Sequence, residues 1–352
     1  MQAPSWLLEI KKSIFPWLNS LRNERQHGAF QWCREGSDSN VFLGASALAL
    51  KIAYQINKLN ELKPDELNQS IDFISSFQNA GSGRYAGLFV DKIQLGNRGW
   101  RSYFKKSVDT ILGETRQACA ALIGARAQPR FAIQNIPRTE KEVKKYIDKL
   151  PWATNPWAAG SLISNLLFSH FINDKYFGFS EDYERITPII FERLDLLQDD
   201  KTGSWFMENP PVYQKINAAM KVLLSYELTG KPFKFPEKLI DFCLGEEIIN
   251  NACHDVDILY VVHQCFQWVE YRSNDVREFA KRKLNALEVY KKPDGAFSFY
   301  PDKAQIKYYG APISKGMFES DLHGTHLLVW ACTLLSDLLG FKDQLGWKQP
   351  IT

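Results

Sequence analysis

The stretch QDDKTGSWF, at residues 198–206, decides the fold, because it places a glycine turn and two aromatic side chains between two predicted helices. Two other stretches follow the same plan, QNAGSGRY at 78–85 and KKPDGAFSF at 291–299. Glycine supplies a positive φ, and the aromatic side chain after it returns to cap the helix pair. A glycine-rich phosphate loop is the alternative, but no turn ends in Gly-Lys-Ser/Thr. The turns therefore predict repeated helical hairpins.

Helical periodicity dominates the rest of the chain, and alternating strand patterns are nearly absent. Helices are predicted at about 4–22, 40–59, from Pro64, 104–124, 139–149, 157–173, 180–198, 213–229, 235–245, 255–271, 274–291 and 321–339. Segments rich in Ala, Gly and Cys alternate with charged, amphipathic segments, which is typical of buried helices paired with solvent-facing ones. The sequence predicts an all-α fold, an (α/α)6 toroid. Its inner helices contain Ala47, Ala120, Gly160, Ala219, Asp257 and Ala331.

The chain is expected to be one domain over residues 1–352, in which the N-terminal helix 4–22 closes the ring. Lys and Arg number 43 against 40 Asp and Glu, so the net charge of +3 gives no indication of nucleic-acid binding. Aromatic residues make up 13% of the chain, which suggests an aromatic-lined pocket. The six cysteines are widely spaced and are expected to be reduced core thiols.

The N-terminus has no basic segment before its first apolar residues, so a secretory signal is not expected. The most apolar stretch, residues 41–50, is about half as long as a membrane span. These features predict a cytoplasmic protein, and they leave a peripheral contact with a membrane open.

Two polar clusters lie at the starts of predicted inner helices. The first contains His254, Asp255 and Asp257, and the second contains Asp321 and His323. One interpretation is structural, with Asp255 and Asp321 as helix caps or first-turn acids. A cap explains one acid per helix, so the additional Asp257 and the histidines favour a functional site. Because neighbouring inner helices of a toroid start at the same end, we expect Asp257 and His323 to approach each other.

The turns resemble those of the terpenoid cyclase and protein prenyltransferase superfamily, whose α/α toroids carry the pattern Gln-x-x-Asp-Gly-Ser-Trp. The stretch 198–206 keeps Gln, Gly-Ser and Trp, with one extra residue and with Thr202 in place of Asp. Residues 294–297 keep Asp-Gly and have Phe297 in place of Trp. The alternation of helices extends the resemblance from about residue 40 to 340.

The resemblance implies a class II terpenoid cyclase, in which an Asp-x-Asp-Asp motif protonates an alkene or epoxide. Asp255 and Asp257 match its first two acids, which makes Asp257 the proton donor, and Ile258 stands where the last acid would be. His254 or His323 would bond the acid or deliver its proton. Aromatic faces would hold the cationic intermediates, and the candidates are Trp152, Trp157, Trp205, Phe299, Tyr308 and Tyr309.

Protein prenyltransferases bind zinc in the same region through Asp, Cys and His. Asp257 and His323 resemble two of these ligands, but Leu259 occupies the cysteine position, so no metal or other cofactor is expected and zinc stays an alternative. A substrate diphosphate would need basic groups, for which Arg84, Arg101 and Arg116 are candidates.

Two other classes stay open. Toroids also house glycoside hydrolases and polysaccharide lyases, for which Asp257, Asp321, His323, Tyr308 and Tyr309 would suit paired-carboxylate hydrolysis or proton abstraction. A non-catalytic toroid that binds a ligand or a partner needs no catalytic acid. The predicted partner is a small-molecule substrate, an isoprenoid or a glycan.

Overall fold

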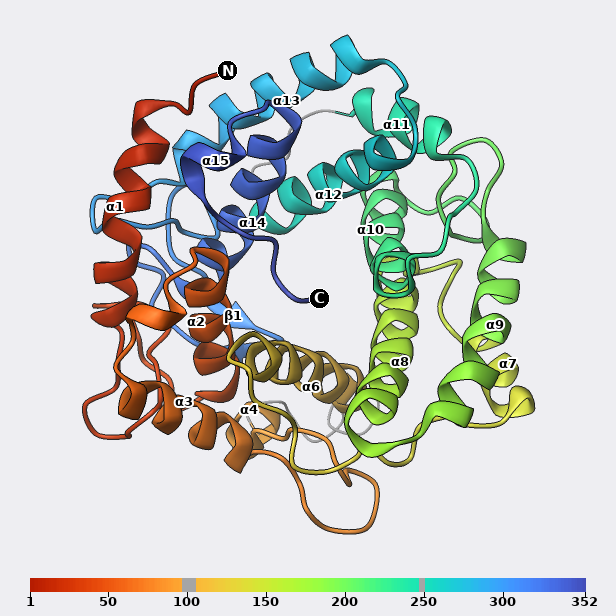
Figure 1. Ribbon diagram of the computed structural model, residues 1–352, viewed down its shortest axis with the longest axis horizontal. Helices are drawn as coiled ribbons and strands as arrows, with labels where there is room; N and C mark the ends of the chain where they lie inside the picture. The colour runs from red at the N-terminus through yellow and green to blue at the C-terminus, as the bar shows by residue number, and fades with distance from the viewer. Residues whose placement is uncertain (97–105, 247–250) are drawn as a thin grey trace.

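The computed structural model describes residues 1–96, 106–246 and 251–352, and this part of the chain is mostly helical (Figure 1). The helices are α1 (Ser5–Asn19), α2 (Leu43–Gln55), α3 (Pro64–Ser76), α4 (Lys92–Gly96), α6 (Lys106–Gly124), α7 (Glu140–Asp148), α8 (Pro156–Phe177), α9 (Ser180–Leu197), α10 (Val212–Thr229), α11 (Pro236–Leu244), α12 (Ala252–Trp268), α13 (Ser273–Leu287), α14 (Leu322–Leu338) and α15 (Lys342–Leu345). Two 3-10 turns, Leu59–Glu61 and Glu288–Tyr290, and a two-residue hairpin of β1 (Lys307–Tyr308) and β2 (Ala311–Pro312) complete the regular structure. The all-helical prediction is confirmed.

Six helices contact one another in a closed cycle. The order is α2, α6, α8, α10, α12, α14 and back to α2, so the last helix of the cycle packs against the first. Figure 1 shows these helices around the centre of the molecule and the C-terminus inside the cycle. They are the six segments that the Ala- and Gly-rich pattern assigns to an inner layer.

The remaining long helices lie outside the cycle (Figure 1). α1 packs beside α2, and its Trp17 indole donates to Asp294 in the turn before α14, at 3.1 Å. Ser13 Oγ in the same helix donates to the carbonyl of Gly295 at 2.7 Å. The first helix is therefore fastened to the turn that precedes α14.

The glycine turns have the predicted structural role. Gly83, Gly203 and Gly295 all have positive φ, at 105°, 76° and 106°. The Gln198 amide donates to the carbonyls of Gly203 in its own turn and Lys234 after the next helix, at 2.8 and 2.6 Å.

Gln78 makes the equivalent bonds in the first turn, to Gly87 at 2.8 Å and Phe131 at 2.7 Å. Gln78 and Gln198 each donate to a carbonyl in their own turn and to a carbonyl in a later segment. The two turns are therefore equivalent structural units. The aromatic partner differs in the first turn, where Gln78 pairs with Phe89 and not with Tyr85.

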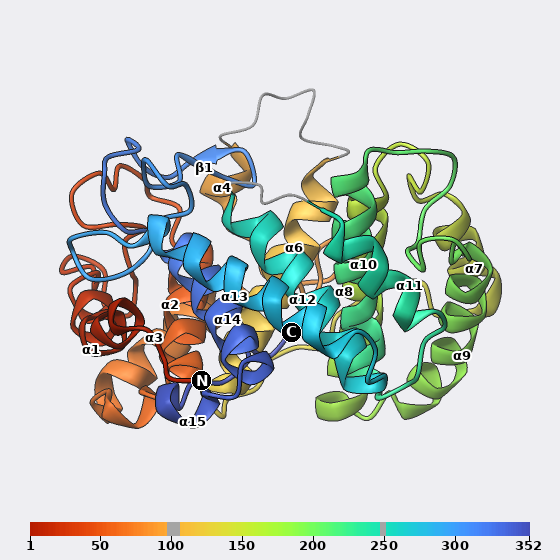
Figure 2. The ribbon, with the colours of Figure 1, turned by 90° about the horizontal axis from the view of Figure 1, so that it is seen from above.

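Figure 2 shows the cycle from the side, with α4 and β1 at one end and α15 at the other. No helix in the described ranges is long and apolar enough to cross a membrane. All six cysteines lie in described segments and are unpaired, and all but the half-buried Cys253 are fully buried.

Candidate functional site

The helical cycle surrounds a cavity of about 380 Å³, a volume typical of sites for small molecules. Each of the six helices contributes to its wall, together with the β1–β2 hairpin and the C-terminal segment. Apolar groups on the wall include Trp157, Leu162, Met220, Leu224, Leu327 and Trp330. Ionisable groups on it include Lys51, Arg116, Lys221, Asp257, His323 and His326. The cavity therefore combines an apolar surface with a group of polar side chains.

Asp257 lies on the cavity wall and is 2% exposed. Its Oδ1 is 3.7 Å from Lys221 Nζ, and its buried Oδ2 has no hydrogen-bond partner among the described residues. Burial raises the pKa of this carboxyl to about 6, and the nearby Lys221 opposes the rise. A carboxyl with this pKa exchanges its proton close to neutral pH, which suits a general acid.

Three basic side chains reach the same cavity from three helices. Lys51 Nζ on α2 donates to Gln117 Oε1 at 2.5 Å, and Arg116 Nη1 on α6 donates to Ser164 Oγ at 2.8 Å. Burial holds the pKa of Lys51 well below its ordinary value, and repulsion from Arg116 and from Lys221 on α10 adds to this effect. These cations lie close enough to act on one another.

His323 also lines the cavity, so the structure brings it to the same cavity as Asp257. Its Nδ1 lies 2.8 Å from Gln305 Oε1, and its ring stacks on Phe299 with centroids 5.1 Å apart. Burial lowers the pKa of His323 to about 3, and Lys221 and Lys51 add to the shift. The imidazole is therefore neutral near pH 7. Of the two roles expected from the sequence, this favours a hydrogen bond to the acid over delivery of its proton.

Three of the six aromatic candidates line the cavity: Trp157, Tyr308 and Tyr309. Tyr308 packs on Trp32 with ring centroids 4.7 Å apart, and Tyr309 packs edge-on against Tyr308 at 4.6 Å. The hairpin that carries these tyrosines covers one side of the site, so their rings face the space where a ligand would lie.

The other three aromatic candidates do not lie on this wall. Trp152 is buried and donates its indole N–H to the carbonyl of Ile147 at 3.1 Å, and Trp205 is buried against Tyr226. Phe299 supports His323 from behind. The expectation that these three bind substrate is corrected, because they are packed into the protein interior.

Asp255 and Asp257 face different surroundings, because residues two apart on a helix point in nearly opposite directions. Asp255 is 1% exposed, and its oxygens accept from Lys283 Nζ at 2.9 Å and from the Tyr290 hydroxyl at 2.7 Å. These bonds tie α12 to α13 and to the segment after it. Asp255 is thus placed as a structural ion-pair partner, away from the central cavity.

His254 lies with Asp255 beside a separate pocket of about 230 Å³. Its Nδ1 is 2.9 Å from the side-chain nitrogen of Asn217, and its ring packs against Trp157 at 5.9 Å. Burial lowers the pKa of His254. His254 is thus not on the wall of the central cavity, although the Trp157 ring that it contacts is.

Asp321 is the N-cap of α14, which is the structural interpretation of the second cluster. Its Oδ1 accepts from the backbone N–H of Gly324 at 2.8 Å. Its Oδ2 accepts from Phe299 and Gln305 at 2.7 and 3.0 Å. Both oxygens accept backbone hydrogen bonds, which favours a structural role for Asp321. Burial still raises the pKa of Asp321 to about 6, as it does for Asp257.

Of the three arginines proposed to bind a diphosphate, one lines the central cavity. Arg116 lines the central cavity, whereas Arg84 lies beside a different pocket, next to Tyr85. Arg101 lies outside the described residues. In the described ranges, no group of three His, Cys, Asp or Glu side chains is arranged to hold a metal ion.

Three further residues on the cavity wall were not expected from the sequence: Lys51, Lys221 and His326. Lys51 is a charged residue near the end of an apolar run, and Lys221 directly follows the Ala-rich segment of its helix. Burying a cation within an otherwise apolar inner helix costs free energy. A lysine at such a position is therefore the sequence signal that could have indicated Lys51 and Lys221 as site residues. His326 lies on the cavity wall one helical turn after His323, and its Nδ1 is 2.7 Å from Gln55 Oε1.

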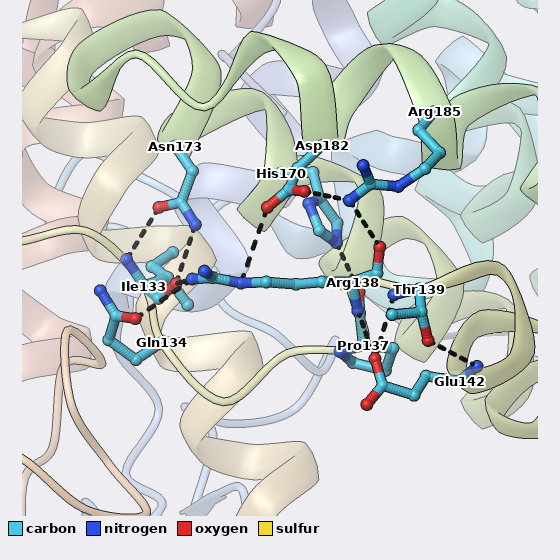
Figure 3. Close-up of polar contacts among 10 residues, drawn as sticks. All are labelled: Ile133, Gln134, Pro137, Arg138, Thr139, Glu142, His170, Asn173, Asp182 and Arg185. Atoms are coloured by element: carbon cyan, nitrogen blue, oxygen red, sulfur yellow. Dashed lines mark hydrogen bonds and ion pairs between the residues drawn. The ribbon is translucent and has the colours of Figure 1, made fainter.

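A second polar cluster, shown in Figure 3, is self-contained. The side chain of Asn173 on α8 bonds both the N–H and the carbonyl of Ile133, each at 2.8 Å. His170 Nε2 lies 2.9 Å from the carbonyl of Pro137, and Asp182 pairs with Arg138 and Arg185. These contacts fasten the loop before α7 to α8 and α9, so the cluster is structural.

No protein-family model matches the chain, and no curated protein matches it.

Proposed function

We propose that the protein is a terpenoid cyclase-like enzyme on an (α/α)6 toroid, in which Asp257 protonates an apolar, isoprenoid-type substrate. The toroid is supported by the closed cycle of six inner helices, the outer layer of helices and the equivalent bonds of Gln78 and Gln198 in their turns. These features agree with the superfamily that the turns resemble.

The observation that carries the proposal is that Oδ2 of Asp257 is buried and has no hydrogen-bond partner in the part of the chain that the structure describes. A buried polar atom without a partner is costly, and such atoms are retained where chemistry uses them. The atom belongs to a carboxyl with a raised pKa on a largely apolar cavity wall. This arrangement suits an acid that delivers its proton to a group that does not hydrogen-bond strongly, such as an alkene.

In the proposed step, the O–H bond of Asp257 breaks and its proton forms a new C–H bond with the π electrons of a double bond. The carboxylate left behind faces Lys221, which stabilises the negative charge. The carbocation lies against the faces of Trp157, Tyr308 and Trp330, whose quadrupoles attract positive charge. A second double bond of the substrate attacks the carbocation and forms the C–C bond of the ring. A proton lost from a carbon next to the new cationic centre passes to water and restores an alkene, and Asp257 regains its proton from water.

The alternative of paired-carboxylate glycan hydrolysis is less well supported. It needs a second available carboxyl, and Asp321 has both oxygens bonded to backbone N–H groups. Proton abstraction by a histidine or tyrosine, as in a polysaccharide lyase, is tested by the same experiment.

The experiment incubates purified protein in D2O with linear prenyl diphosphates, squalene-type alkenes and, separately, acidic oligosaccharides. Protonation at carbon places one deuterium in the product, which mass spectrometry detects. Asp257→Asn should fold and lose about 10²–10⁴-fold in turnover, the usual effect of removing a general acid. Asp255→Asn is the matched control on the same helix, and it should keep its turnover per folded molecule.

Cleavage of the oligosaccharides alone would move the assignment to the carbohydrate class. Product without deuterium, or full activity in Asp257→Asn, would exclude Asp257 as the acid. Loss of activity in chelator would restore the zinc alternative.

A further inference from the structure

A second pocket, of about 280 Å³, lies between the C-terminal ends of α10 and α12. Among the described residues, none lines both this pocket and the central cavity. Tyr226 on α10 and Trp268, the last residue of α12, give it two aromatic walls. Gly230 follows α10 with a φ of 65°, and the chain beyond it brings Phe233 to the same pocket. Three aromatic rings from three segments therefore surround one space.

The three rings stand at steep angles to one another. Tyr226 and Phe233 have centroids 5.6 Å apart and ring planes at 62°, and Phe233 and Trp268 have centroids 6.3 Å apart and planes at 77°. Trp268 is 48% exposed, so its ring can receive a ligand from solvent. A flat sugar ring stacks on one aromatic face, whereas rings at such angles surround a compact, rounded group. The geometry favours a rounded group.

The charge on the pocket wall is negative. Glu227 contributes a carboxylate, and the other lining residues of the described part carry no formal charge. The oxygens of Glu227 accept from the Tyr260 hydroxyl at 2.7 Å, the Gln264 amide at 3.3 Å and the Thr352 hydroxyl at 3.2 Å. All three donors are neutral, so they hold the carboxylate in place without cancelling its charge.

The neighbouring cations lie outside the pocket wall. Lys231 Nζ lies 4.8 Å from the centroid of the Phe191 ring, and Lys234 pairs with an aspartate on α9 at 3.1 Å. Arg116 acts on the charge of Glu227 from the wall of the central cavity. Aromatic faces are the negative part of a ring quadrupole, so the three rings and Glu227 together present negative potential to a ligand in the pocket.

We infer that the pocket formed by Tyr226, Glu227, Phe233 and Trp268 binds a quaternary ammonium group. Such a group spreads its charge over methyl groups and cannot donate a hydrogen bond, so aromatic faces attract it and it needs no matched acceptor. Glu227 adds the attraction of an opposite charge on one side. The inference is independent of the proposed function, because this pocket does not contain Asp257.

The experiment measures binding of choline and of tetramethylammonium by isothermal titration calorimetry at constant ionic strength. Dimethylbutanol, which has carbon in place of the choline nitrogen, is the neutral control of the same shape. It should bind about 10-fold more weakly than choline, because it lacks the charge that the rings and Glu227 attract.

Two variants locate the site. Trp268→Leu keeps an apolar side chain but removes the ring, and it should weaken choline binding about 3- to 30-fold, as expected for loss of a cation–π contact. Glu227→Gln keeps an acceptor for Tyr260 and removes the charge, and it should weaken binding about two- to fivefold. Glu270→Gln removes an exposed carboxylate two residues after Trp268 and should leave binding unchanged. Circular dichroism establishes that each variant is folded.

Absence of saturable choline and tetramethylammonium binding to the wild type at millimolar concentration would overturn the inference. Equal affinity for choline and dimethylbutanol would show an apolar pocket with no preference for a cation, and unchanged affinity in Trp268→Leu would place any binding elsewhere. Vesicles of phosphatidylcholine distinguish the source of the ammonium group. Cosedimentation of the wild type but not of Trp268→Leu assigns it to a lipid headgroup, and binding of free choline without cosedimentation assigns it to a soluble molecule.

Discussion

Asp257 on α12 lies 3.7 Å from Lys221 on α10, and among the residues that the structure describes this is the one ion pair of a carboxyl that is 2% exposed. The contact is too long to offset burial, which raises the pKa of Asp257 to about 6. The folded protein therefore binds a proton at this site more tightly than the unfolded chain does.

This raised pKa predicts that Asp257→Asn stabilises the protein at neutral pH. Between about pH 4 and pH 6 the folded state holds a proton that the unfolded state has released, so the burial cost appears as pH rises through this window. Two pKa units correspond to about 3 kcal/mol, so the variant should gain up to that amount at pH 8 and little at pH 4. Urea unfolding at both pH values measures the difference.

Glu184→Gln, which neutralises an exposed carboxyl on α9, is the control. Its effect on the free energy of unfolding should be small and the same at pH 4 and pH 8. A stability gain for Asp257→Asn that is the same at pH 4 and pH 8 would contradict the assignment of the pKa.

The sequence was sufficient for the helices and the glycine turns, because both depend on local patterns. The alternation of Ala-rich and charged segments identified the six helices of the inner cycle, and Gln198 and Gly203 identified a turn. The sequence also indicated Asp257 and His323, which both line the cavity, because a polar cluster before an apolar helix can be recognised from the residue order alone.

The division of roles between Asp255 and Asp257 was not predictable to the same extent. Helical geometry separates residues two positions apart, but the partner Lys283 is known only from the fold. Lys51 and Lys221 were missed for a similar reason, since the meeting of single lysines from α2 and α10 depends on how the helices close around the cavity.

Asp255 and Lys283 form a buried ion pair, and we predict that removing one partner destabilises the protein more than removing both. Asp255→Ala leaves the Lys283 charge buried, and it should cost about 3–5 kcal/mol in the free energy of unfolding. The double variant Asp255→Ala with Lys283→Met removes both charges and should be more stable than Asp255→Ala alone. A double-mutant cycle by urea unfolding measures the coupling, and strictly additive effects would contradict it.

Acid should destabilise the protein partly through His323. Its pKa is lowered to about 3 in the folded state, so the unfolded chain binds more protons between about pH 6.5 and pH 3 and stability falls as pH decreases through this range. His323→Gln should reduce the slope of stability against pH by up to about 1.4 kcal/mol per pH unit. Urea unfolding from pH 7 to pH 4 provides the slopes, and His27→Gln, at an exposed position, serves as the control. Parallel slopes for wild type and His323→Gln would show that the pKa of His323 is the same in the folded and unfolded states.

Two glycines in ring helices are predicted to differ sharply when they are replaced by alanine. A Cβ on Gly324 would lie 2.2 Å from the backbone nitrogen of Phe299 and 2.3 Å from the carbonyl carbon of Ser298. Because both are backbone atoms, relieving the clash requires a backbone shift, which costs more free energy than a side-chain rotation. Gly324→Ala should therefore cost more than about 3 kcal/mol, at the upper end of overpacking effects. Thermal unfolding measures this loss.

Gly113→Ala should instead change the site and spare the fold. Its Cβ would lie 2.5 Å from Tyr309 Oη, the end of a side chain that is 39% exposed and can rotate away. Alanine is also favoured over glycine inside a helix by about 1 kcal/mol, which offsets the cost of moving the tyrosine. We expect a melting temperature close to that of the wild type and a changed turnover of the alkene substrates, because Tyr309 forms part of the cavity wall. A melting temperature lowered as far as that of Gly324→Ala would show that Tyr309 is held rigidly, and unchanged turnover would place Tyr309 outside the substrate site.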